Sequence, residues 1–123
     1  MVPYKNDVPG TGYEIAVIPA TTDPSNWIDV GSAVYLLLEM PAAWTAADLL
    51  VQAKVQGDGG SVTDDSGIAT TLTVSAGKLV GISMVALQIA GARFIRFKSV
   101  STANSDTAVA QAAARTIYVG LKG

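Results

Sequence analysis

The sequence predicts an all-β fold in which two antiparallel sheets pack as a sandwich. Apolar residues recur in short segments with the alternation of extended chain. Clusters of Gly, Pro, Asn, Asp and Ser separate these segments at short intervals. The length of 123 residues fits one domain, and no internal repeat or linker divides the chain. These observations together favour a sandwich of immunoglobulin or jelly-roll type.

The first half of the chain is expected to contain four strands, at residues 13–18, 27–28, 33–40 and 49–56. The strand at 33–40 is apolar on both faces except at Glu39, so it is predicted to be covered on both sides and to end before Pro41. The strand at 49–56 alternates apolar and polar residues, which indicates one face toward a core. In the connection between these two strands, Thr45 is expected to cap a single helical turn.

The second half is expected to contain four more strands, at residues 70–75, 79–82, 92–100 and 115–121. Gly-rich turns at 57–60 and 64–67 precede them. Ser83 is predicted to cap one short helical turn within 83–90. The strand at 92–100 interleaves basic residues with Phe, Ile and Val, which is typical of a strand near an edge or an interface.

An N-terminal arm is expected over residues 1–12, and the sandwich domain over residues 13–123. The arm is rich in turn-forming residues and poor in apolar ones, and it is predicted to dock on a neighbouring subunit with Tyr4 as a candidate interface residue. Its start lacks a basic region followed by an apolar one, so no secretory signal is expected and synthesis is expected in the cytoplasm. The longest uncharged apolar stretch, residues 79–92, is shorter than the about 20 residues of a membrane span, so no membrane partner is expected.

The residue inventory argues against an enzyme. The chain has no Cys and no His, which excludes disulfides, thiolate zinc sites and Ser-His or Cys-His nucleophile pairs. The two glutamates, Glu14 and Glu39, are not brought together by any pattern, so a glycosidase pair is not expected. The open alternative is calcium ligation by three aspartates in turns: Asp58, Asp64 and Asp65. Their spacing does not match an EF-hand loop, and solvated carboxylates in turns are commoner than calcium sites. The prediction is therefore a non-enzymatic protein without a metal or cofactor.

The charge composition favours protein partners over nucleic acid. The net charge of −2 provides no broad positive field for a phosphate backbone. Only 15% of the residues are charged, against about 25% in an average soluble domain. Such a surface suits burial against partners, so a homo-oligomer is predicted, a trimer or a dimer.

Two groups of side chains are candidates for binding. One is an aromatic group that could form a platform for a sugar ring: Trp27, Trp44, Tyr35 and Tyr118. The alternative places these aromatic residues in the core or in a subunit interface. The other is a basic group that could bind a phosphate or an acidic partner surface: Arg93, Arg96, Lys98 and Arg115. Protection of a strand edge by charge explains the basic group equally well.

Four motifs follow one another along residues 28–121. They are residues 40–49 (MPAAWTAADL), Val51-Gln52 with 58–60 (DGG), 91–96 (GARFIR) and 111–117 (QAAARTI). In this order they resemble a group of small structural proteins of tailed bacteriophages. The resemblance implies a virion protein without catalytic residues, most simply a head decoration or cement protein with a jelly-roll fold. It implies the capsid surface as the location and the major capsid protein as the partner. A tail or fibre component, or a carbohydrate-binding sandwich displayed on the virion, remain as alternatives.

Overall fold

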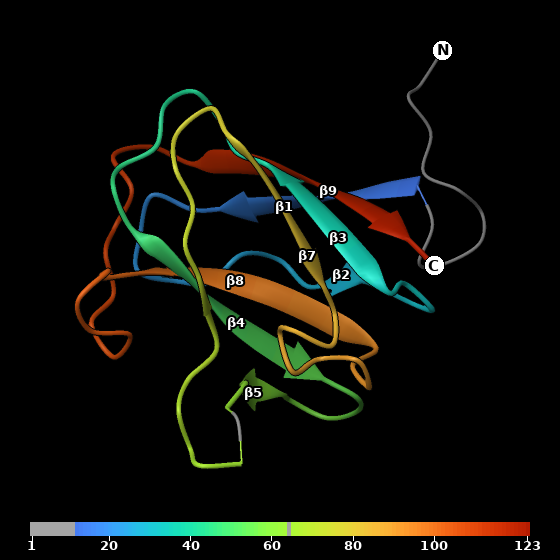
Figure 1. Cartoon of the computed structure of the whole chain (residues 1–123). Coiled ribbons are helices and arrows are strands. Elements are labelled where there is room, and N and C mark those ends of the chain that lie inside the picture. The colour runs from blue at the N-terminus through green and yellow to red at the C-terminus, as the bar shows by residue number, and fades with distance from the viewer. Residues whose placement is uncertain (1–11, 64) are drawn as a thin grey trace.

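The computed structural model describes residues 12–63 and 65–123, which form two antiparallel sheets packed face to face (Figure 1). The predicted all-β sandwich is confirmed. The four-stranded sheet has the order β1 (Gly12–Ile18), β9 (Arg115–Lys122), β3 (Tyr35–Glu39) and β7 (Leu79–Ser83). The five-stranded sheet has the order β2 (Ile28–Asp29), β8 (Phe94–Val100), β4 (Asp48–Lys54) and β5 (Gly60–Ser61), and β6 (Thr71–Leu72) also pairs with β4.

The strand order is that of a jelly roll. The chain crosses repeatedly between the two sheets, so most pairs join segments that are far apart in the sequence. β1 pairs with β9, and β2 pairs with β8. β3 lies between β9 and β7, and β4 lies between β8 and β5. The first half of the chain is thus wrapped against the second half, as in double-sheet jelly rolls.

The core fills the space between the sheets with the inward side chains of each strand. Ile117 and Val119 of β9 face Ile95 and Phe97 of β8 in one cluster, and all four are fully buried. The period of two places these residues on one face, because successive strand side chains point to opposite sides of a sheet. The alternation seen in the sequence is therefore the alternation of the core.

The strand predicted at residues 33–40 differs from its prediction. β3 spans Tyr35–Glu39, with Leu36 and Leu38 buried, while Tyr35 and Leu37 are 57% and 48% exposed. The prediction of cover on both sides is wrong. An outward face made of apolar residues has the same pattern in the sequence as a second buried face, and only the neighbouring elements distinguish the two.

The predicted helical turn after β7 is confirmed. The Ser83 Oγ accepts a hydrogen bond from the Ala86 N–H at 3.1 Å, and the Leu87 N–H donates to the Ser83 carbonyl at 3.2 Å. Gln88 follows in a left-handed conformation with φ of 61°. The turn then closes as a Schellman motif, because the Gln88 N–H donates to the Val85 carbonyl and the next N–H donates to the Met84 carbonyl.

The predicted cap at Thr45 is wrong. The chain between β3 and β4 makes bends, and the Thr45 N–H donates instead to the Gln111 side-chain oxygen at 2.8 Å. A distant side chain thus supplies the partner that a local helical turn would have provided.

Several predictions fall on positions outside the described residues. They concern residues 1–11 of the proposed arm, including Tyr4, and Asp64 of the candidate calcium group. Gly12, which the prediction placed in the arm, is the first residue of β1.

Candidate functional site

The outer face of the four-stranded sheet is apolar and exposed. We call it the apolar face and define it by the outward apolar side chains of its strands: Tyr13, Ile15, Val17, Tyr35, Leu37, Leu79 and Tyr118. Tyr13 is half-buried, and the exposed fractions of the other six range from 39% at Val17 to 63% at Leu79. Alternation also places Glu39 and Lys122 on this face as its charged side chains. An apolar sheet face of this kind is suited to burial against a partner.

Strand register gives the apolar face its relief. One row across the sheet runs Tyr13, Gly120, Leu37 and Gly81, and the next row runs Ile15, Tyr118, Glu39 and Leu79. The Leu37 side chain leans toward Gly81, since a Cβ at Gly81 would lie 3.5 Å from the Leu37 Cδ1. The space above Gly120 therefore stays open between Leu37 and the two tyrosines.

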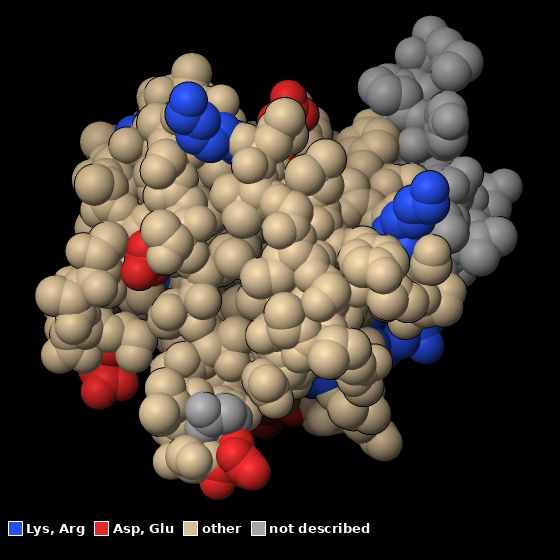
Figure 2. Space-filling view, in the orientation of Figure 1, with Lys and Arg blue, Asp and Glu red and all other residues tan. Residues whose placement is uncertain are grey.

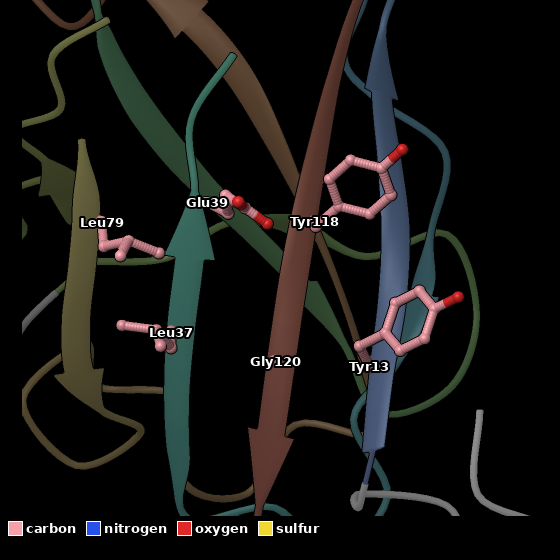
Figure 3. Close-up of a pocket in the computed structure, with 6 residues that line it drawn as sticks. All are labelled: Tyr13, Leu37, Glu39, Leu79, Tyr118 and Gly120. Carbon is pink, nitrogen blue, oxygen red and sulfur yellow. The ribbon is translucent and has the colours of Figure 1, made fainter. Parts of the chain in front are cut away.

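That open space is a pocket of about 410 Å³ (Figure 3). Its lining consists of Tyr13, Leu37, Glu39, Leu79, Tyr118 and Gly120. The rings of Tyr13 and Tyr118 form one wall, with centroids 6.3 Å apart and planes tilted by 59°. A second hollow of about 330 Å³ shares Leu37 and Gly120 with the first and extends toward Tyr35 and Lys122. Together they make an apolar groove along β9, which fits protruding aliphatic or aromatic side chains of a partner.

The edge of this sheet at β1 is partly blocked. The Asn26 side chain accepts a hydrogen bond from the Val17 N–H at 2.8 Å and donates to the Ile15 carbonyl at 2.9 Å. It thereby occupies the backbone groups that an added strand would need. Addition of another strand along this part of β1 is therefore disfavoured.

The structure does not bring the predicted aromatic platform together. Tyr35 and Tyr118 lie on the apolar face, while Trp27 lies against the five-stranded sheet beside Lys54. Trp44 is half-buried, packs against the core, and donates from Nε1 to the Ala47 carbonyl at 3.3 Å. The four aromatic side chains therefore occupy three separate places.

The predicted basic group is partly assembled. Arg93 directly precedes β8, Arg96 and Lys98 lie on it, and Arg115 lies on β9 of the other sheet. Arg93 forms a two-point ion pair with Asp29, at 3.1 and 3.3 Å. The hydrogen bond and then the charge of Asp29 raise the pKa of the Arg93 guanidinium above its ordinary value.

Neither a metal cluster nor a spanning helix is found in the part of the chain that the structure describes. There, His, Cys, Asp and Glu form no group of three or more that could hold a metal ion. No helix in the same ranges has the length and apolar character needed to cross a bilayer. Figure 2 shows one side of the molecule, where charged side chains are few and separated.

Sequence reasoning did not single out Tyr13, Leu37, Leu79 or Gly120 as site residues. A signal for part of this site exists in β1, where Tyr13, Ile15 and Val17 alternate with the buried Ala16 and Ile18. A strand with apolar residues on both faces, in a sandwich whose sheets each cover one face, exposes an apolar surface. No local signal marks Gly120, because its effect depends on its cross-strand neighbours.

Comparison with known proteins gives one structural similarity. The crystal structure of the SPBc2 prophage-derived protein YomS is similar to this chain, with a TM-score of 0.48 and 12% sequence identity, over 89% of this chain and 95% of YomS. No protein-family model and no curated protein sequence matches.

Proposed function

We propose that this protein is a non-enzymatic structural protein of a tailed-phage virion, which decorates the assembled head by docking its apolar face on the major capsid protein. The observation that carries the proposal is the exposed apolar groove over Gly120, on a sheet whose edge at β1 is partly blocked. The resemblance of four sequence motifs to small tailed-phage structural proteins supports the choice of partner. The location proposed is the outer surface of the capsid.

The physical basis is burial of apolar surface on a rigid support. Each Å² of apolar area removed from water contributes about 25 cal/mol, before the cost of association is subtracted. The ridge at Leu37 and the adjacent hollow allow side chains of the partner to interdigitate, which a flat surface would not. A subunit that binds only the assembled shell stabilises it by its own binding free energy, and many copies add up.

The carbohydrate-binding alternative is not the one we propose. It needs aromatic rings gathered beside polar groups that fix sugar hydroxyls. Trp27, Trp44 and the two tyrosines, Tyr35 and Tyr118, lie in three separate places.

The proposal is tested with phage heads that lack this protein. Purified protein is added to such heads, and the amount that sediments with them is measured by gel densitometry. Leu37→Lys places a charge at the centre of the groove, and we expect it to lower occupancy at a fixed concentration at least tenfold (about 1.4 kcal/mol). Val55→Lys is the matched control, because Val55 is 74% exposed and lies outside the apolar face.

Two outcomes distinguish the parts of the proposal. Heads decorated by the unaltered protein should resist heat longer than bare heads, as mass action requires. If Leu37→Lys binds the heads at full occupancy, the apolar face is not the surface that docks on the capsid. Absence of the unaltered protein from all purified particles would remove the virion role itself.

A further inference from the structure

The outer face of the five-stranded sheet concentrates positive charge on a chain whose net charge is −2. Four of the eight Lys and Arg residues lie on β4, on β8 or directly before β8: Lys54, Arg93, Arg96 and Lys98. In β8, Arg96 and Lys98 alternate with buried Phe97, so both point away from the core. Across the ladder, Arg96 is paired with Gln52 and Lys54 with Phe94.

Aromatic rings hold three of these cations in place, namely Lys54, Arg93 and Arg96. The Arg96 guanidinium carbon lies 4.2 Å from the centroid of the Trp27 ring, and the Lys54 Nζ lies 4.7 Å from the same ring. Lys54 is also 5.2 Å from the Phe94 ring, which Arg93 approaches at 5.3 Å. Cation–π contacts of this kind orient a charge without neutralising it. We call Lys54, Arg96 and Lys98, with Trp27 and Phe94, the basic ladder.

The backbone also positions the central ring. A Cβ at Gly59 would lie 2.9 Å from the tip of the Trp27 ring, so the tight turn between β4 and β5 passes directly against it. Gly59 has a φ of +73°, a conformation in which glycine carries no Cβ penalty. Because Trp27 packs against this turn, the cations stacked on it start from a defined geometry.

Three cations of the basic ladder keep their charge free for a ligand. Arg93 is neutralised by Asp29, but Lys54, Arg96 and Lys98 form no ion pair with any residue in 12–63 or 65–123. Arg96 donates from Nε to the neutral Gln52 Oε1 at 2.6 Å. That bond fixes the guanidinium plane and leaves its terminal nitrogens available. An oriented guanidinium is suited to two-point binding of a carboxylate.

We propose that the basic ladder binds an acidic segment of a protein partner that lies extended along β8. Alternate residues of a strand are about 7 Å apart, which is the spacing of Arg96 and Lys98 along β8. An extended segment with Asp or Glu at alternate positions repeats its carboxylates at that same interval. Lys54, on the neighbouring strand, adds a third positive charge beside them.

A protein segment fits this surface better than single-stranded nucleic acid does. Nucleic-acid binding on a sheet face uses open aromatic rings on which bases stack. Here Trp27 and Phe94 already have cations over their rings, so neither offers an unoccupied platform. The inference does not depend on the virion role, and the basic ladder is on the sheet opposite the apolar face.

The test titrates the full-length protein into two fluorescent peptides of equal composition and measures anisotropy. One peptide alternates Glu and Thr, and the other carries the same glutamates in a single block. We expect the alternating peptide to bind at least about fivefold more tightly, and added salt to weaken its binding. A single-stranded oligonucleotide of equal charge is the third probe. Tighter binding of the oligonucleotide, or equal binding of both peptides, would overturn the proposal.

Variants connect the binding to the basic ladder. Arg96→Gln and Lys98→Gln are each expected to weaken binding of the alternating peptide about tenfold. Arg96→Lys should weaken it less, because it keeps the positive charge but loses the two-point geometry of the guanidinium. Lys78→Gln is the matched control. Lys78 lies in an exposed turn between β6 and β7, and the substitution removes one positive charge, as the other two do. Thermal melting of each variant monitors folding. If both Arg96→Gln and Lys98→Gln melt like the unaltered protein and bind the peptide like Lys78→Gln, the proposal is wrong.

Discussion

The side chain of Gln111 forms a two-point hydrogen-bonded pair with the backbone of Thr45, 66 residues away in the chain. Its Oε1 accepts from the Thr45 N–H at 2.8 Å, and its Nε2 donates to the Thr45 carbonyl at 2.9 Å. Nε2 also donates to the Ser99 Oγ at 3.0 Å, and Arg115 donates from Nε to Oε1 at 3.3 Å. Gln111 is 2% exposed, and its amide joins two loops and two strands, β8 and β9.

We expect Gln111→Leu to lower the free energy of unfolding by about 3 kcal/mol, because the Thr45 N–H and carbonyl lose their partner at a buried position. Urea denaturation followed by circular dichroism measures the change. Gln56→Leu, at an exposed position just after β4, is the control and should change stability by less than about 0.5 kcal/mol. Equal losses in the two variants would contradict a role for the pair.

Three glycines near β5 provide a graded test of the turn that supports Trp27. We expect Gly59→Ala to destabilise by about 3 kcal/mol, because a Cβ there would meet the Ala53 carbonyl oxygen at 2.7 Å as well as the ring. Gly57→Ala should cost about 1 kcal/mol, since Gly57 has a φ of +81° but open space around it. Gly60→Ala should be nearly neutral. Chemical denaturation ranks the three, and any other order would refute this account of the turn.

Gln88 carries a left-handed backbone conformation that glycine adopts without a Cβ penalty. We therefore expect Gln88→Gly to stabilise the protein by about 1 kcal/mol and to raise Tm by about 4 °C. Differential scanning calorimetry gives both values. Gln56→Gly is the comparison, because Gln56 is exposed and has no positive φ, and it should not stabilise. A lower Tm for Gln88→Gly would show that the side chain contributes more than the strain costs.

We predict that the free protein self-associates, because few of its residues are charged and its apolar face is exposed. Sedimentation velocity at micromolar concentration should show a dimer or trimer, since burial of the apolar face removes exposed side chains from water. Leu37→Lys should shift the distribution toward the monomer, and Val55→Lys should leave it unchanged. A monomer for the unaltered protein would end this prediction without affecting attachment to a shell.

Eight of the nine strands in the described part of the chain were predictable, because alternation and turn residues are local properties, whereas β5 begins in a predicted turn. The strand predicted at 115–121 matches β9 to within a residue, and Ile117 and Val119 face the core as their spacing indicates. The cap by Ser83 was likewise visible in the sequence. Its hydroxyl accepts a hydrogen bond from the N–H of Ala86, only three residues later, so the contact is local. Features that depend only on residues close together in the chain could thus be inferred from the sequence.

Tertiary structure decided everything that depends on which segments become neighbours. Leu37 belongs to a strand that was predicted to be covered on both faces, yet its position between Gly120 and Gly81 makes it a ridge beside an open groove. Gln111 and Arg96 acquire their roles from Thr45 and Trp27, which lie at least 66 positions away in the chain. The class of fold and the buried alternation of the strands could be inferred from the residues alone. The jelly-roll wrapping decided which outward side chains meet, since a hydrogen bond or ring contact between distant segments leaves no period in the sequence for either partner.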